Sequence, residues 1–393
     1  MTYKRKNLAD HLKSDGQPKR ILALDGGGLR GILTVGALQK IEDVLRERHG
    51  GSEEFRLCHY FDLIAGTSTG AIIAAALAQG WTVQQVYEKY MALGNTVFEK
   101  SFFRKGLFRA KYDEGKLIEE LKEVYGEDTT LGSDRLKTGL LVVTKRLDSG
   151  SPWPLGNNPK GKYHDSRPGG TIGNGDYPLW QVVRASTAAP TFFDPEEITI
   201  SEKQGHPPTK GNFVDGGVSP YNNPALQALM YATLEGNKVG WPLGEDNVFL
   251  VSVGTGSADP EVARKNMAAA QGLSALQSLM EDCAAMQETM LQWMSSSPTA
   301  KTIDRQLGSL DKDLIAGQPL LQYMRYNVEL TEESVRELLP GLNDVKQIES
   351  LSEMDAPENM NILHELGVAL AKRDVENNHF PQHFDLPGKQ FTK

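Results

Sequence analysis

The stretch Phe61-Asp-Leu-Ile-Ala-Gly66-Thr-Ser68-Thr-Gly70-Ala-Ile-Ile-Ala-Ala-Ala-Leu-Ala-Gln79 carries the most informative pattern in the chain. Its first five residues form an apolar run that predicts a buried strand, and the Ala-rich run that ends at Gln79 predicts a helix. Between them, Gly66 to Gly70 reads Gly-x-Ser-x-Gly, which in a strand–turn–helix context indicates a nucleophile elbow. Ser68 is therefore a candidate nucleophile, and the alternative is that it only caps the helix.

The same pattern occurs once before this stretch. Arg20-Ile-Leu-Ala-Leu-Asp25 predicts a buried strand, and Asp25-Gly-Gly-Gly-Leu-Arg-Gly31 follows it as a tight turn. The next helix is predicted by apolar residues at helical spacing: Leu33, Val35, Leu38, Ile41 and Leu45. Further strands are predicted over residues 139–144, 212–215 and 248–253. Strands that alternate with helices predict an α/β fold with a mainly parallel central sheet flanked by helices.

Shifts in composition divide the chain into three expected regions. Residues 1–18 predict a basic polar arm, and residues 19–258 predict the catalytic domain. Residues 259–393 predict a helical C-terminal region that serves as a lid, a dimer contact or a regulatory element, with an amphipathic helix over residues 265–294. Residues 150–176, which are rich in Pro, Gly, Asn and Ser, predict one long surface loop.

The overall composition excludes several classes of protein. The chain has 393 residues and a net charge of −9, which argues against a nucleic-acid coat. Two cysteines, Cys58 and Cys283, are too few for a disulfide framework or a structural zinc site and favour a reducing compartment. The longest apolar run, residues 71–78, is far shorter than the roughly 18 residues of a spanning helix. We therefore expect a soluble protein of the cytoplasm.

The glycine-rich turn after the first predicted strand is a candidate anion site. A run of glycines lets backbone N–H groups point at an anion, and beside Ser68 these groups would form an oxyanion hole. The alternative is a dinucleotide-binding turn, because Gly26, Gly28 and Gly31 also spell Gly-x-Gly-x-x-Gly. That motif needs an acidic residue at the end of the next strand, and here the next strand leads to Ser68.

A nucleophilic serine also needs a base. One candidate is Asp215, which ends a short apolar strand and precedes Gly216-Gly217; its alternative role is that of a simple Asp-Gly turn residue. The other candidates are the late histidines of a Ser-Asp-His order: His364, His379 and His383. An Asp with an ordinary pKa near 3.9 is a weak base, so the first reading requires burial of Asp215.

Taken together and in this order, Asp25-Gly-Gly-Gly-Leu-Arg-Gly31, Gly66-Thr-Ser-Thr-Gly70 and Asp215-Gly-Gly217 resemble the motifs of the patatin-like phospholipases. The segment from Arg184 to Phe193 is similar to that family's Ala-Ser-x-Ala-Ala-Pro segment, and the resemblance covers residues 19–256. It implies a three-layer α/β fold and lipid acyl hydrolysis without metal or cofactor. It also implies a Ser-Asp dyad of Ser68 and Asp215. The implied oxyanion donors and supporting motif residues are Gly26, Gly27, Gly28, Arg30, Gly31, Gly66, Gly70, Gly216 and Gly217.

The resemblance also implies partners. The expected substrate is membrane phospholipid at the inner membrane surface, and some similar bacterial proteins respond to cyclic oligonucleotides in anti-phage defence. We therefore expect a cyclic oligonucleotide activator and assembly into a homodimer or larger oligomer. We do not expect a nucleic acid polymer as a partner. The basic and aromatic stretch Lys100–Tyr112 suits an anionic lipid surface. The alternatives are an ungated lipase or esterase, a Ser-Asp-His enzyme, a nucleotide-binding module and a relative that has lost activity.

Overall fold

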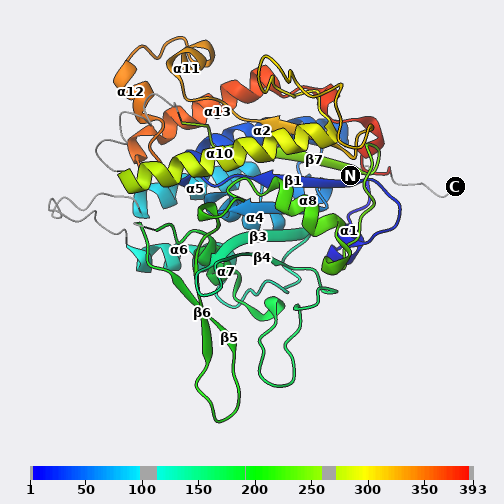
Figure 1. The fold of residues 1–393 in the computed structure, drawn as a ribbon, viewed down its shortest axis with the longest axis vertical. Coiled ribbons are helices and arrows are strands. Elements are labelled where there is room, and N and C mark those ends of the chain that lie inside the picture. The colour runs from blue at the N-terminus through cyan, green and yellow to red at the C-terminus, as the bar shows by residue number, and fades with distance from the viewer. Residues whose placement is uncertain (1–2, 98–112, 191, 259–270, 389–393) are drawn as a thin grey trace.

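The computed structural model describes residues 3–97, 113–190, 192–258 and 271–388, with the side chains of residues 271–276 excepted. Lys100–Tyr112, which we expected at a lipid surface, lies outside the described residues. Within them, the chain forms an α/β fold with one nine-stranded sheet, which agrees with the predicted class (Figure 1). The strands are β1 Lys19–Leu24, β2 Leu63–Thr67, β3 Gly139–Arg146, β4 Ser151–Gly156, β5 Glu196–Ser201, β6 Thr209–Asp215, β7 Val248–Val253, β8 Ser295–Ser296 and β9 Leu321–Tyr326.

The order of the strands places the two glycine turns side by side. The sheet runs β5-β6-β3-β2-β1-β7-β9-β8, with β4 paired to β3 outside this path. From β3 to β8 the neighbours are parallel, whereas β4, β5 and β6 join in antiparallel register. Because parallel strands end at the same edge, the turns that follow β1 and β2 meet at the carboxyl edge of the sheet.

Helices cover both faces of the sheet. They are α1 Leu8–Leu12, α2 Gly31–Arg48, α3 Leu57–Tyr60, α4 Thr69–Ala78, α5 Val83–Val97, α6 Glu114–Tyr125, α7 Leu179–Ser186, α8 Ala225–Thr233, α10 Gln271–Met294, α11 Glu332–Leu338, α12 Val345–Ser350 and α13 Met360–Asp374. Successive strand side chains point to opposite faces. On β1, Leu22 and Leu24 pack with the helices on the side of α2 and α13, while Ile21 and Ala23 pack with α8 on the other. The result is a sheet between two helical layers (Figure 1).

The region after residue 258 departs from the helical expectation. It does contain α10 to α13, but it also supplies β9, which pairs in parallel with β7 inside the central sheet. Without β9, the buried strand β7 would expose an unpaired edge. The expected amphipathic helix is present as α10, yet its buried positions include Gln287, Glu288 and Gln292 beside Leu291. Gln277 and Met280 of the same helix line the pocket described below.

Two smaller expectations also need correction. The described part of the expected polar arm, residues 3–18, packs against the core: Tyr3, His11 and Leu12 are buried, and the Lys6 ammonium lies 2.7 Å from the Asp62 carboxylate. The expected loop of residues 150–176 begins with β4, which extends the hairpin from β3. The N-terminal segment is held by contacts with residues far along the chain, whereas β4 is held by a hairpin with the strand just before it.

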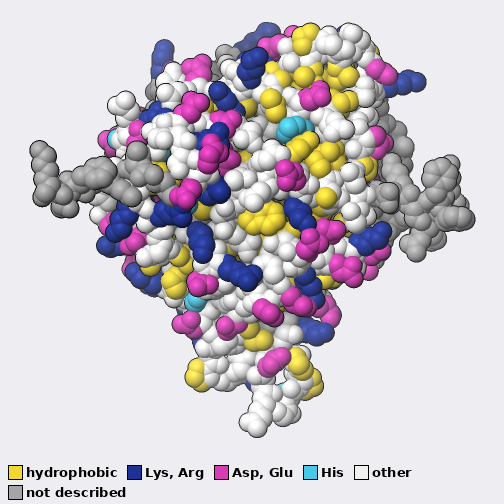
Figure 2. Space-filling model, turned by 180° about the vertical axis from the view of Figure 1, so that it is seen from behind, with side chains coloured by type: hydrophobic (Ala, Val, Ile, Leu, Met, Phe, Trp, Pro, Cys, Tyr) yellow, Lys and Arg dark blue, Asp and Glu magenta, His cyan; other side chains and the backbone are white. Residues whose placement is uncertain are grey.

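The surface opposite α10 carries a mixture of charges. Figure 2 shows Lys and Arg side chains interspersed with Asp and Glu side chains over this face. Among the described residues, no helix combines the length and the apolar character needed to cross a bilayer.

Candidate active site

Ser68 lies on a sharp turn between β2 and α4. Its backbone has φ 54° and ψ −126°, a strained conformation for a residue with a side chain. The two flanking glycines permit it: a Cβ at Gly66 would lie 2.3 Å from the Gly70 carbonyl oxygen, and one at Gly70 would lie 2.2 Å from that of Leu24. The turn places the Ser68 side chain at the N-terminus of α4, where the helix dipole favours negative charge.

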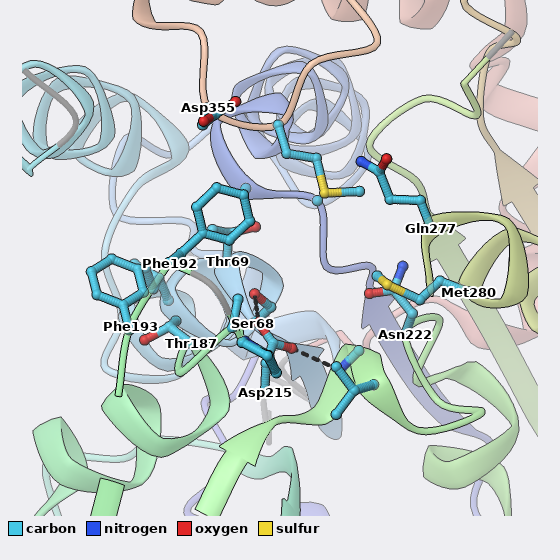
Figure 3. A pocket seen from close by; sticks show the side chains of 18 of the residues that line it. Ser68, Thr69, Thr187, Phe192, Phe193, Asp215, Asn222, Gln277, Met280 and Asp355 are labelled. Carbon is cyan, nitrogen blue, oxygen red and sulfur yellow. Dashed lines mark hydrogen bonds between the residues drawn. The ribbon is translucent and has the colours of Figure 1, made fainter. Parts of the chain in front are cut away.

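Asp215 meets Ser68 from the end of β6. The Ser68 hydroxyl donates to Asp215 Oδ2 at 2.5 Å, and the Gly217 N–H donates to Asp215 Oδ1 at 2.7 Å (Figure 3). The Asp215 N–H donates in turn to the carbonyl of Ala188, which follows α7. Both carboxylate oxygens are thus held, and one of them points at the candidate nucleophile.

Burial changes the chemistry of this carboxylate. Asp215 is only 5% exposed, and desolvation raises its pKa to about 6, while the hydrogen bonds from Ser68 and the Gly217 N–H oppose the rise. A raised pKa makes the carboxylate a stronger base. The burial that the sequence argument required is therefore present.

The glycine turn after β1 lies against Ser68. A Cβ at Gly26 would lie 3.0 Å from Ser68 Cβ, and Gly28 has a φ of 59°, where a Cβ would meet the Met354 carbonyl oxygen at 2.3 Å. Only glycine fits at Gly28. Within the described residues, the N–H groups of Gly27 and Gly28 have no hydrogen-bond acceptor, whereas the N–H of Gly26 donates to Asn222. Gly27 and Gly28 border the same pocket as Ser68.

Three residues that the sequence argument missed support this arrangement. Ser186 accepts a hydrogen bond from the Ser68 N–H at 2.8 Å and donates to the Val143 carbonyl at 2.6 Å. Asn222 Nδ2 and Thr255 Oγ1 both donate to the Gly26 carbonyl, at 3.2 and 3.1 Å. Ser186 lies in the segment that resembles the family's Ala-Ser-x-Ala-Ala-Pro segment, and Asn222 lies seven residues after Asp215. Their nearness in sequence to these motifs is the signal by which they could have been found.

Ser68 and Asp215 open into a largely apolar pocket. It holds about 860 Å³ of empty space, including the part open to solvent. Figure 3 shows Phe192 and Phe193 on one side of Ser68 and Met280 and Gln277 of α10 on the other. Further lining residues are Gly27, Gly28, Thr69, Ile72, Leu93, Leu117, Thr187, Ala189, Pro190, Gly217, Val218, Asn222, Met354 and Asp355. A mainly apolar lining with a few polar groups is typical of small-molecule sites.

The remaining candidate residues lie elsewhere. Arg30 is buried, but it does not line the pocket; its guanidinium approaches the Ser352 carbonyl at 3.5 Å in the loop after α12. Burial lowers its pKa. Gly31 begins α2, and Gly216 packs where a Cβ would meet the Val143 carbonyl oxygen at 2.3 Å.

The late histidines do not join the site. His364 packs against Tyr87, His379 contacts Tyr326, and His383 lies 3.5 Å from Asp246. The described lining of the pocket includes no histidine, so a Ser-Asp-His arrangement around Ser68 is not what the fold assembles. In the described part of the chain, no group of three or more His, Cys, Asp or Glu side chains is placed to hold a metal ion.

Comparison with known proteins identifies the family. The model of the patatin-like phospholipases matches residues 22–229, more than half of the chain. The chain is 30% identical over 232 residues to a cGAMP-activated phospholipase of Vibrio cholerae, covering 56% of this chain and 58% of that protein. It is 26% identical over 258 residues to a cGAMP-activated phospholipase of Escherichia coli, covering 64% and 66%. It is also 27% identical over 233 residues to Patatin-T5 of Solanum tuberosum, covering 56% and 54%.

The chain therefore belongs to the patatin-like phospholipase family. Each of these alignments spans less than two thirds of the relative it matches.

Proposed function

We propose that this protein is a lipid acyl hydrolase of the phospholipase A type, which cleaves carboxylic ester bonds of membrane phospholipids. The observation that carries the proposal is the 2.5 Å hydrogen bond from Ser68 to buried Asp215 inside an apolar pocket. Family membership supports the same reaction class. Its substrate is reached at the inner membrane surface.

Acylation follows from the groups around Ser68. The Ser68 Oγ attacks the ester carbonyl carbon and passes its proton to Asp215 Oδ2. The negative carbonyl oxygen of the tetrahedral intermediate accepts hydrogen bonds from the N–H groups of Gly27 and Gly28, which are otherwise without acceptors in the described structure. The bond to the alcohol oxygen then breaks, and that oxygen takes the proton from Asp215.

Deacylation reverses these roles. Water attacks the acyl carbon and gives a proton to Asp215, which returns it to Ser68 Oγ as the ester bond breaks and the fatty acid leaves. This cycle uses one buried carboxylate as base and then as acid, and it needs no other titratable side chain. The raised pKa of Asp215, about 6, suits both steps.

The test is hydrolysis of a fluorogenic phospholipid in vesicles by wild type, Ser68→Ala and Asp215→Asn. We expect both variants to lose activity by about 10³-fold or more, since removing a nucleophile or its base eliminates the covalent route. Ser149→Ala, at an exposed turn after β3, serves as the matched control and should retain wild-type activity. Full activity in Ser68→Ala would contradict the proposal. Activity that survives Asp215→Asn alone would assign the base to another group.

We extend the proposal to regulation by a cyclic oligonucleotide. Two relatives carry the name cGAMP-activated phospholipase. In this chain, Gln277, Met280, Met354 and Asp355 of the C-terminal region line the pocket, so a ligand that moved this region would change the site. Vesicle hydrolysis with and without a panel of cyclic di- and trinucleotides tests it. Stimulation by one nucleotide, lost in Ser68→Ala, is the expected result, and equal rates throughout would indicate an ungated lipase.

A further inference from the structure

Two buried ion pairs of the same kind lie at opposite ends of β1. Arg20 is the second residue of β1. Its guanidinium donates to Asp62 Oδ2 from Nε at 2.9 Å and from Nη2 at 2.7 Å. Just after its last residue, Asp25 accepts from Arg325 Nη1 at 3.0 Å and Nη2 at 2.6 Å. Both pairs are almost completely buried. They are separated by five residues of strand, about 17 Å.

The Asp25–Arg325 pair joins the glycine turn to the C-terminal region. Arg325 lies on β9, and its Nη1 also donates to Ser252 Oγ of β7 at 2.7 Å. Glu288 of α10 lies 3.9 Å from Arg325 Nε. Side chains of β7, β9 and α10 therefore meet at the Arg325 guanidinium, which pairs with the carboxylate that precedes Gly26.

Asp25 is the residue through which this cluster acts on the turn. Its N–H donates to the Val253 carbonyl, so its backbone is fixed to β7, and its side chain is fixed to β9 by two charge-assisted hydrogen bonds. The next residues along the chain are Gly26, Gly27 and Gly28. Glycines have the widest backbone freedom, so the direction of their N–H groups depends on what holds the turn. Asn222 and Thr255 hold the Gly26 carbonyl, Tyr90 holds that of Gly28, and Asp25 anchors the N-terminal flank.

We propose that Arg325 is a positioning residue for ester hydrolysis: by holding both oxygens of Asp25 it aims the N–H groups of Gly27 and Gly28 at the oxyanion. This inference rests on the proposed function. It assigns a role in the reaction to the C-terminal region, outside the residues that the family model matches. Arg20, by contrast, stabilises the opposite end of the strand and has no part in the site.

The two pairs provide a matched experiment. Lysine keeps the positive charge but lacks the planar fork that holds a carboxylate through two bonds. Arg325→Lys and Arg20→Lys therefore make the same chemical change at each end of β1. Rates are measured on vesicles of the fluorogenic phospholipid and divided by the concentration of folded sites, titrated with a fluorophosphonate that labels Ser68.

We expect Arg325→Lys to lower kcat by about 10- to 100-fold with KM unchanged, somewhat less than the 10²- to 10³-fold loss typical when an oxyanion donor is removed outright. Arg20→Lys should lower thermal stability but leave kcat at the wild-type value. An unchanged kcat in Arg325→Lys, or the same loss of kcat in both variants, would overturn the inference.

A second measurement is independent of activity. Hydrogen–deuterium exchange of the peptide that spans residues 24–33 should increase in Arg325→Lys and stay at the wild-type level in Arg20→Lys. If wild type hydrolyses no ester, the proposed function fails, and this exchange measurement still decides whether Arg325 fixes the turn. Unchanged exchange in that peptide would overturn the positioning role in either case.

Discussion

Asp215 shows how much a single side chain depends on its surroundings. Its carboxylate accepts from Ser68 and from the Gly217 N–H, which favour the charged form, but burial outweighs them and the pKa rises. The Arg184 guanidinium, which also opposes the rise, contributes least of these causes. The base in the proposed mechanism is therefore produced by desolvation.

The pH dependence of hydrolysis follows from that pKa. Below about pH 6 Asp215 is protonated and accepts no proton from Ser68, so kcat/KM should rise roughly tenfold per pH unit up to about 6 and level off above it. Initial rates on a short-chain fluorogenic ester from pH 4.5 to 8 measure this. A profile that is flat down to pH 4.5 would exclude Asp215 as the titrating base.

At the scale of elements, α2 and α13 pack through their backbones. A Cβ on Gly367 of α13 would lie 2.1 Å from the Leu33 carbonyl oxygen, and one on Gly36 of α2 would lie 2.6 Å from that of His364. The two helices therefore approach more closely than side chains allow. This contact fixes α13 against the helix that follows the glycine turn.

Gly367→Ala should destabilise the protein by about 2 kcal/mol or more, because the added methyl group meets backbone that cannot rotate away. Thermal or urea denaturation measures the change. Gly236→Ala is the control, since nothing lies within 4 Å of its added Cβ, and it should melt within about a degree of wild type. Equal stability of the two variants would mean that the helices separate at little cost.

Glu42 links α2 to α5 and makes stability depend on pH. Its Oε2 accepts from the Val83 N–H, its Oε1 has no described partner, and burial raises its pKa to about 7. A raised carboxyl pKa means that the folded state holds the proton more tightly than the unfolded state does. The contribution to stability is complete below about pH 4.5 and is lost as the pH rises through about 7.

Glu42→Gln should therefore match wild type near pH 4 and exceed its stability by about 2 to 3 kcal/mol at pH 8, since the amide keeps the acceptor without the buried charge. Melting temperatures of both proteins across this range provide the measurement. A constant difference between them over the whole range would contradict the linkage.

At the scale of the whole molecule, the sheet joins distant parts of the chain. β9 completes the sheet beside β7, α13 covers α2, and Arg325 pairs with Asp25. At the other end, Lys6 and His11 contact buried Asp62 beside Arg20. Segments separated by about 300 residues thus share one core.

A fragment of residues 1–258 should accordingly fail to form a protease-resistant domain. Removing the rest exposes one edge of β7, uncovers the apolar face of α2 and leaves the buried Asp25 carboxylate without its cation. Limited proteolysis and a thermal melt, run beside the full chain, give the answer. A cooperative melt of the fragment would show that residues 19–258 fold alone.

The sequence determined the local features of this protein. Gly66, Gly70 and the apolar strand before them are sufficient for the elbow at Ser68, and Asp215 with Gly216 and Gly217 marks a strand end, because turns and buried strands leave short-range signals. The fold class and the family followed from these motifs, and the candidate site residues were predicted from them. Each motif describes neighbours within a few residues.

The tertiary structure decided what distant residues contribute. The placement of Asp215 beside Ser68 and the burial that raises its pKa depend on strand order. The hydrogen bonds of Asn222 and Thr255 to Gly26 and the pairing of Arg325 with Asp25 depend on it as well. The position of β9 in the sheet and the packing of the polar N-terminal segment also depend on it. Desolvation and long-range hydrogen bonds belong to the assembled core, and no window of sequence contains them.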